Sequence, residues 1–152
     1  MFKMNAGINM AHVPYRGIAP ALTDLMGAQV QVIFASIPSS IPYVMSGALR
    51  ALAVTTAKRS EALPEVPTVG EFLPGYDASI WYGVGAPKKT PTEIVEKLNK
   101  EINAALADPK LKTRFAEIGA EPMMMTPAEF EKFVAAETEK WAKVIRAANI
   151  KL

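Results

Sequence analysis

Three apolar runs of strand length alternate with two short helical segments in the first third of the chain, and this order limits the possible folds. The apolar runs cover residues 10–15, 29–34 and 49–55. The segments between them, 20–26 and 36–46, have apolar residues at the spacing of a helix. Strands joined by helical crossovers pair in parallel, and the crossovers are right-handed. The sequence therefore predicts an α/β fold built on a parallel βαβαβ sheet.

Proline and glycine mark the ends of these predicted helices. Pro20 and Pro38 suit a first helical turn, where an N–H group would lack an intrahelical partner in any case. Glycine readily adopts the left-handed conformation in which many helices end. Glycines stand at the expected ends of three helical segments, the first of which covers residues 1–6: Gly7, Gly27 and Gly47.

The second half of the chain has a different pattern. Prolines and glycines in 57–78 predict a covering loop with one helical turn near 68–73, followed by a strand over 79–86. The remainder is predicted to form three helices, with a short strand over 121–125 before the last of them.

Three helix starts in this half have clear capping signals. Thr-Pro-x-Glu occurs at 90–93 and again at 126–129. In each, we expect the Thr and Glu to form a capping box, with Pro at the first helical position. Asp108 is expected to cap the middle helix and Gly119 to end it.

The composition excludes several kinds of site. The chain has 152 residues, half of them hydrophobic, and a net charge of +2, so it can build a core and gives no reason to expect nucleic acid or a membrane surface as partner. It has no cysteine and a single histidine, His12, so we expect no metal and no cofactor. Residues 1–7 lack the hydrophobic region of a signal peptide, and no stretch reaches the ~20 apolar residues of a membrane span.

Catalytic patterns are also missing from the sequence. No G-x-S-x-G turn, phosphate-binding loop or dinucleotide fingerprint occurs. The acidic side chains fall on polar helix faces or in loops, rather than as a pair in an apolar cleft. We therefore predict that the chain is not an enzyme and has no catalytic residue.

Binding of a small anion is the chemistry that the strand ends favour. Ligands of parallel sheets bind beyond the carboxyl ends of the strands. Gly17 and Ala19 would let backbone amides approach a carboxylate, and Arg16 could supply a charged partner. Ser36 and Thr55 offer neutral hydroxyls at the next two strand ends. Simpler roles stay open: a surface charge for Arg16, a turn for Gly17 and a helix cap for Ser36.

Two adjacent aromatic residues, Trp81 and Tyr82, could form a wall of the same site. Neighbouring residues of a strand point in opposite directions, so we expect one ring to pack inside and the other to face the ligand. The simpler alternative is that Trp81 only packs in the core.

Four motifs in this order resemble those of one family. They are Tyr15-Arg16-Gly17-Ile18-Ala19-Pro20, the run from Leu49 to Arg59, Pro64-Glu65-Val66-Pro67-Thr68 and Trp81-Tyr82-Gly83. Together they are similar to the second half of the Bug-type periplasmic solute receptors of tripartite tricarboxylate transporters. The resemblance extends over nearly all of the 152 residues.

The resemblance implies a type II periplasmic binding protein fold, incomplete relative to the two-lobed receptor. Residues 1–54 would form the βαβαβ portion of the second lobe with its anion loop. Residues 55–152 would form the crossover loop, a strand and the C-terminal helices of the other lobe. The resemblance also places Tyr15 in the site through its Tyr-basic-Gly-x-Ala-Pro motif. Where members often have Asp after the second strand, this chain has Ala35.

The function implied by the resemblance is non-enzymatic capture of a small di- or tricarboxylate in the periplasm, for delivery to membrane transporter subunits. Half a receptor would leave an apolar face and a sheet edge exposed, so we expect a homodimer in which a second copy covers them. Alternatively, the chain is a truncated remnant or fragment that serves only as a structural or interaction module, without binding a ligand.

Overall fold

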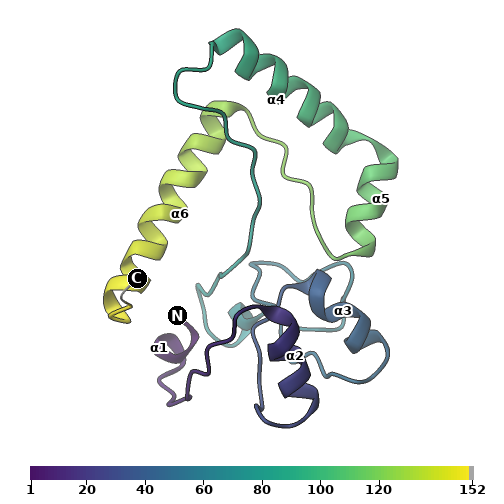
Figure 1. Cartoon of the computed structure of the whole chain (residues 1–152), viewed down its shortest axis with the longest axis vertical. Helices are drawn as coiled ribbons and strands as arrows, with labels where there is room; N and C mark the ends of the chain where they lie inside the picture. Colours follow the sequence, from purple (N-terminus) through teal and green to yellow (C-terminus); the bar gives the residue numbers. More distant parts are fainter. Residues whose placement is uncertain (151–152) are drawn as a thin grey trace. The chain divides into compact units, whose positions relative to one another are not determined.

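The computed structural model describes residues 1–150, and helices joined by extended segments make up this part of the chain (Figure 1). The helices are α1 (Phe2–Ala6), α2 (Ile18–Met26), α3 (Ile37–Met45), the 3-10 helix η1 (Val69–Glu71), α4 (Thr92–Ala107), α5 (Pro109–Glu117) and α6 (Pro127–Ala147). Within these residues, none of the helices has both the length and the apolar character needed to cross a bilayer.

The described chain divides into two compact units. The N-terminal unit comprises Phe2–Trp81 together with Arg114–Ala120. The helical unit comprises Met1, Tyr82–Thr113 and the residues from Glu121 onward. Each unit is therefore built from chain segments that are separated in the sequence.

The predicted parallel sheet is not confirmed, because residues 1–150 contain no assigned β-strand. A single parallel bridge joins Val54 to Thr68, through hydrogen bonds of Val54 N to Pro67 O and Val69 N to Val54 O, both 2.8 Å. The strands predicted over 10–15, 79–86 and 121–125 are extended segments instead, as is most of 49–55. In 29–34, residues 29–31 form a bend and only the rest is extended. A ladder needs a neighbouring chain segment to accept and donate its hydrogen bonds, and the described residues supply one only at Val54.

The N-terminal unit takes part of its core from residues 57–78, the segment that the sequence predicts as a covering loop. The buried apolar residues of the unit are Ala21, Leu22, Val54, Val69 and Tyr76. The Phe2 ring lies 6.1 Å from the Tyr76 ring, edge to face, and 5.3 Å from the Phe34 ring. Residues 57–78 therefore do more than cover the unit, since they supply part of its interior.

The helix ends in this unit follow the predictions closely. Helix α2 ends at Met26 before Gly27, and α3 has Ser36 as its N-cap with Pro38 in the first turn. The predicted helical turn near 68–73 is η1, which begins with a capping box between Thr68 and Glu71.

In the helical unit, one of the two predicted capping boxes forms. Thr126 accepts from Glu129 N at 3.3 Å, and the Glu129 carboxylate accepts from Thr126 N at 2.8 Å. The box predicted at 90–93 is wrong, because α4 begins one residue later with Pro91 as N-cap and no side-chain cap. Thr90 instead closes a turn by donating its N–H to Pro87 O at 2.9 Å. Asp108 caps α5 as predicted, accepting from Lys110 N at 2.8 Å.

Helices α4 and α6 of this unit pack against each other. The side-chain amides of Asn99 and Asn103 both donate to the Met125 carbonyl, at 2.9 and 3.0 Å. This carbonyl lies directly before the Thr126 cap, so two residues of α4 hold the start of α6.

Candidate functional site

The start of α2 is the part of the predicted site that is open to a ligand. Its N-cap, Gly17, has φ 152° and ψ 178°, and no side chain caps the helix. Residues with a side chain rarely adopt this φ, and a Cβ at Gly17 would meet open space. The first amides of a helix lack intrahelical acceptors, so those of Ile18 and Ala19 are available to an anion.

Arg16 stands directly before this helix start. Its side chain is exposed, and among residues 1–150 it forms no hydrogen bond or ion pair. An unpaired guanidinium beside uncapped helix amides can bind a carboxylate through charge-assisted hydrogen bonds. Arg16, Gly17 and Ala19 are therefore open to a ligand, and their contact with a carboxylate stays a prediction.

Tyr15, by contrast, already has a partner for its hydroxyl. The phenol donates to Asp24 Oδ2 at 2.7 Å, which ties the residue before Arg16 to α2. The hydrogen bond to the Asp24 carboxylate raises the pKa of Tyr15 above its usual value. Its hydroxyl can therefore accept a further hydrogen bond, but it would have to leave Asp24 to donate one.

The two predicted hydroxyl residues also make internal contacts. Ser36 Oγ lies 2.7 Å from Ser39 Oγ within the first turn of α3. Thr55 donates its hydroxyl to Ala78 O at 3.2 Å, and Thr55 O accepts from Ala78 N at 2.9 Å. Since a hydroxyl has one proton, Thr55 cannot give it to a ligand while this pairing holds. Its main-chain N–H, which has no acceptor among the described residues, is the donor that remains.

Trp81 and Tyr82 differ in exposure, as neighbouring residues of an extended segment should. Trp81 is half-buried, whereas Tyr82 is 93% exposed. Trp81 is the last residue of one segment of the N-terminal unit, and Tyr82 begins the helical unit. The two exposures differ in the direction expected for one inward and one outward ring.

Within residues 1–150, no hydrogen bond joins the predicted site residues Arg16, Ser36 and Thr55. Two hollows of the surface lie elsewhere. One of about 390 Å³ is lined mainly by residues 68–77, and one of about 450 Å³ lies along α4 between Glu93 and Glu101. The predicted residues are therefore placed singly, at three points of the N-terminal unit.

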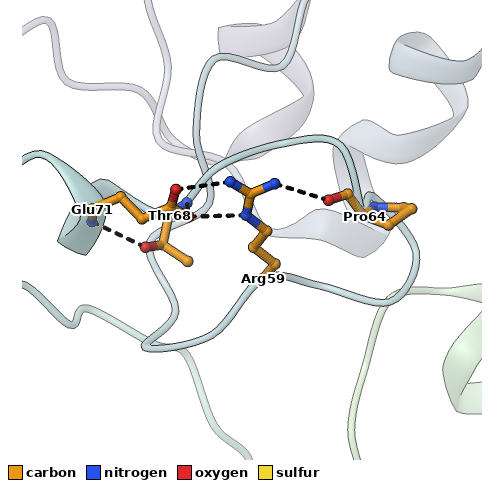
Figure 2. Close-up of polar contacts among 4 residues, drawn as sticks. All are labelled: Arg59, Pro64, Thr68 and Glu71. Carbon is orange, nitrogen blue, oxygen red and sulfur yellow. Dashed lines mark hydrogen bonds and ion pairs between the residues drawn. The ribbon is translucent and has the colours of Figure 1, made fainter.

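A polar cluster absent from the predicted site lies beside the first of these hollows. Figure 2 shows its residues. The Arg59 guanidinium donates to both carboxylate oxygens of Glu71, at 2.9 and 2.8 Å, and to Pro64 O at 3.4 Å. Glu71 Oε1 also accepts from Thr68 N at 2.9 Å, and Thr68 Oγ1 accepts from Glu71 N at 3.2 Å. These contacts, the Arg59–Glu71 clasp, close the loop between residues 59 and 71. The Thr-x-x-Glu spacing of 68–71 is the sequence signal that could have indicated the capping box within this clasp.

The clasp has a marked electrostatic effect on its carboxylate. Hydrogen bonds from Arg59, and then from the Thr68 amide, lower the pKa of Glu71 from 4.5 to about 2. The same pairing raises the pKa of Arg59 above its usual value. Both side chains keep their charge at neutral pH, so the pair stays intact there.

Comparison with known proteins gives a consistent result for the whole described chain. Residues 1–150 match the tripartite tricarboxylate transporter family receptor model. The chain is 38% identical to the protein BugT of Bordetella pertussis, over all of this chain and 47% of BugT.

Two solved structures are also similar. R. palustris Rpa4515 with adipate has 42% identity and a TM-score of 0.87, over 98% of this chain and 50% of its own. MatC from Rhodopseudomonas palustris with bound malate has 30% identity and a TM-score of 0.79, over 95% and 50%. The chain thus spans about half the length of these relatives. It belongs to the tripartite tricarboxylate transporter receptor family.

Proposed function

We propose that the chain is the carboxylate-binding part of a solute receptor for a tripartite tricarboxylate transporter and that it acts without catalysis. The observation that supports this most directly is the uncapped start of α2 with the unpaired Arg16 before it. Helix amides and a guanidinium together supply hydrogen-bond donors and positive charge for one carboxylate group.

The ligand we propose is a small dicarboxylate or tricarboxylate. Two similar structures are named with adipate and malate, and both compounds are dicarboxylates. In this chain, Arg16 would bind one carboxylate and the amides of Ile18 and Ala19 would bind the same group from the helix side. Gly17 would let that group approach the backbone, because no Cβ stands in its way.

The remaining predicted contacts have more limited support. Ser36 could turn its hydroxyl from Ser39 to a ligand, and Thr55 would contribute its main-chain N–H. Tyr15 supports the loop through Asp24. The aromatic wall of Trp81 and Tyr82 stays a prediction.

We further propose that the extended segments become strands of a parallel sheet when partner strands are present. Residues 1–54 would then form the βαβαβ portion of one lobe, and residues 55–152 the crossover and the helices of the other. Exposed apolar residues on these segments support the idea: Phe34 is 54% exposed and Leu52 is 62% exposed. A second copy of the chain, in a homodimer, is the partner that we expect to cover them. In keeping with the family, the receptor would work in the periplasm with membrane transporter subunits.

The test is a thermal-melt screen of the chain with C3 to C6 mono-, di- and tricarboxylates. A ligand at 100 times its dissociation constant stabilises the folded state by about 2.7 kcal/mol, which shifts the melting temperature by several degrees. Arg16→Ala should abolish that shift. Arg50→Ala, which removes another exposed arginine of the same unit, should leave it unchanged.

A flat response of the wild-type chain to every carboxylate would contradict the proposal. It would favour the alternative of a structural or interaction module without a ligand.

A further inference from the structure

The main chain at Val54 and Thr55 is held from two sides by the loop that follows it. On one side, Val54 N donates to Pro67 O and Val54 O accepts from Val69 N, both at 2.8 Å. On the other, Thr55 O accepts from Ala78 N at 2.9 Å. The proposed binding contribution of Thr55 therefore depends on where residues 67–69 and 78 lie.

Those segments are in turn fixed by the Arg59–Glu71 clasp. Glu71 accepts from Thr68 N, which lies between the two residues that bond to Val54. Arg59 donates hydrogen bonds to both carboxylate oxygens of Glu71 and to Pro64 O. Its contacts therefore extend from the start of the loop to η1 (Figure 2). Hydrogen bonds thus run from Arg59 through Glu71 to Thr68, whose covalent neighbours Pro67 and Val69 bond to Val54.

We propose that Arg59 and Glu71 are positioning residues that fix the Thr55 main chain for the carboxylate site. This inference rests on the proposed function, to which it adds two residues that would not touch the ligand. The planar fork of an arginine matches both oxygens of a carboxylate, so it fixes orientation as well as distance.

The exposure of the clasp indicates that its role is local rather than global. Its side chains are 47% and 41% exposed, and exposed ion pairs contribute little to overall stability. Thr68, in contrast, is 5% exposed and Val54 is 6% exposed, so the positions that the clasp controls are in the core. Loss of the clasp should loosen the loop and the Thr55 segment while the helices of the unit stay folded.

The variants Arg59→Ala and Glu71→Gln test this. Glutamine retains the oxygen that accepts from Thr68 N, so Glu71→Gln removes the charged pairing and spares the capping box. Arg59→Lys keeps the positive charge but not the planar fork of the guanidinium, so we expect its effect to lie between the wild type and Arg59→Ala. Arg114→Ala is the matched control, because it removes an exposed arginine and its ion pair with Glu117 in the same unit.

The first measurement is amide hydrogen exchange at Val54, Val69 and Ala78. We expect protection at these amides to fall about tenfold in Arg59→Ala and Glu71→Gln, with protection in α2 unchanged. The control should match the wild type. Unchanged protection at Val54, Val69 and Ala78, or an equal loss throughout the unit, would overturn the positioning role.

The second measurement is carboxylate affinity in the same variants. We expect Arg59→Ala to weaken binding about fivefold, with Arg59→Lys between it and the wild type. Unchanged affinity in Arg59→Ala, despite faster exchange, would overturn the link to the site. If the wild type binds no carboxylate, the proposed function fails, while the exchange data still decide whether the clasp positions Thr55.

Discussion

The tip of the Phe130 ring lies against the backbone of Gly83, and it occupies the space where a side chain at Gly83 would be. Gly83→Ala should therefore displace a ring that is stacked on Phe133. Because the end of a ring can move, we expect the lower part of the overpacking range, a loss of about 1 kcal/mol in the free energy of unfolding. Gly85→Ala is the control, since a Cβ there meets open space. Urea denaturation of both variants gives the comparison, and equal stabilities would contradict the contact.

Gly119, two residues after the end of α5, should tolerate substitution less well than Gly47. Both have positive φ, 68° and 76°, so alanine strains the backbone at either position by about 1 kcal/mol. At Gly119 a Cβ would also overlap Ile37 and approach Ala62, whereas at Gly47 it meets nothing within 4 Å. We expect Gly119→Ala to lose at least about 1 kcal/mol more than Gly47→Ala in chemical denaturation. A smaller loss at Gly119 would argue against the packing on Ile37.

The small stabilisation that the exposed Arg59–Glu71 clasp gives the N-terminal unit should be lost in acid. Folding lowers the pKa of Glu71 from 4.5 to about 2, so the unfolded chain binds this proton more readily. The stabilisation is complete above pH 4.5 and disappears as the pH falls toward 2.

Melting temperatures of the wild type and Glu71→Gln across this range give the test. The melting temperature of the wild type should exceed that of Glu71→Gln by a constant amount near neutrality. This difference should shrink between pH 4.5 and 2. Other carboxylates titrate alike in both proteins, so the difference isolates Glu71. An advantage that persists at pH 2 would contradict the assignment.

Asn99 and Asn103 should be partly redundant in holding the start of α6. Both donate to the Met125 carbonyl, and Asn103 also donates to Asn99 Oδ1 at 3.1 Å. Either alanine variant leaves one donor on the carbonyl, and we expect each to lose about 0.5–1 kcal/mol. The double variant leaves the Met125 carbonyl with neither amide. Its loss in the free energy of unfolding should therefore exceed the sum of the two single losses by about 0.5 kcal/mol or more. Strict additivity in a double-mutant cycle would show that the two amides act independently.

Helix ends were the most predictable part of the fold, because their signals are local. Asp108 and Thr126 act within a few residues of their own position, and both take the predicted role. Helix α2 also ends before Gly27, but the left-handed residue is Ala28, with φ 56°, whereas Gly27 has φ −81°. The capping box wrongly predicted at Thr90 also has a local cause. A competing turn, in which Thr90 donates its N–H to Pro87 O, shifts the helix start by one residue.

The sheet and the site were harder to predict because they depend on distant partners. Thr55 and Ala78 are 23 residues apart, and their pairing takes the hydroxyl that the sequence offers to a ligand. Arg59 and Glu71 are 12 residues apart, with nothing local to couple them apart from the capping box. The apolar runs in 10–15 and 29–34 indicate strand character, but they do not supply the neighbouring strand.

Each compact unit contains one of the two tryptophans, Trp81 in the N-terminal unit and Trp141 in the helical unit. Trp141 donates its indole N–H to Glu137 at 3.0 Å, with Lys140 Nζ 5.7 Å from the ring centroid, so its emission should respond to unfolding of α6. Single-tryptophan chains made by Trp81→Phe or Trp141→Phe would each report on one unit alone. The protein thus has two separate fluorescent reporters, and coincident or staggered transitions would show whether the units unfold together or one at a time.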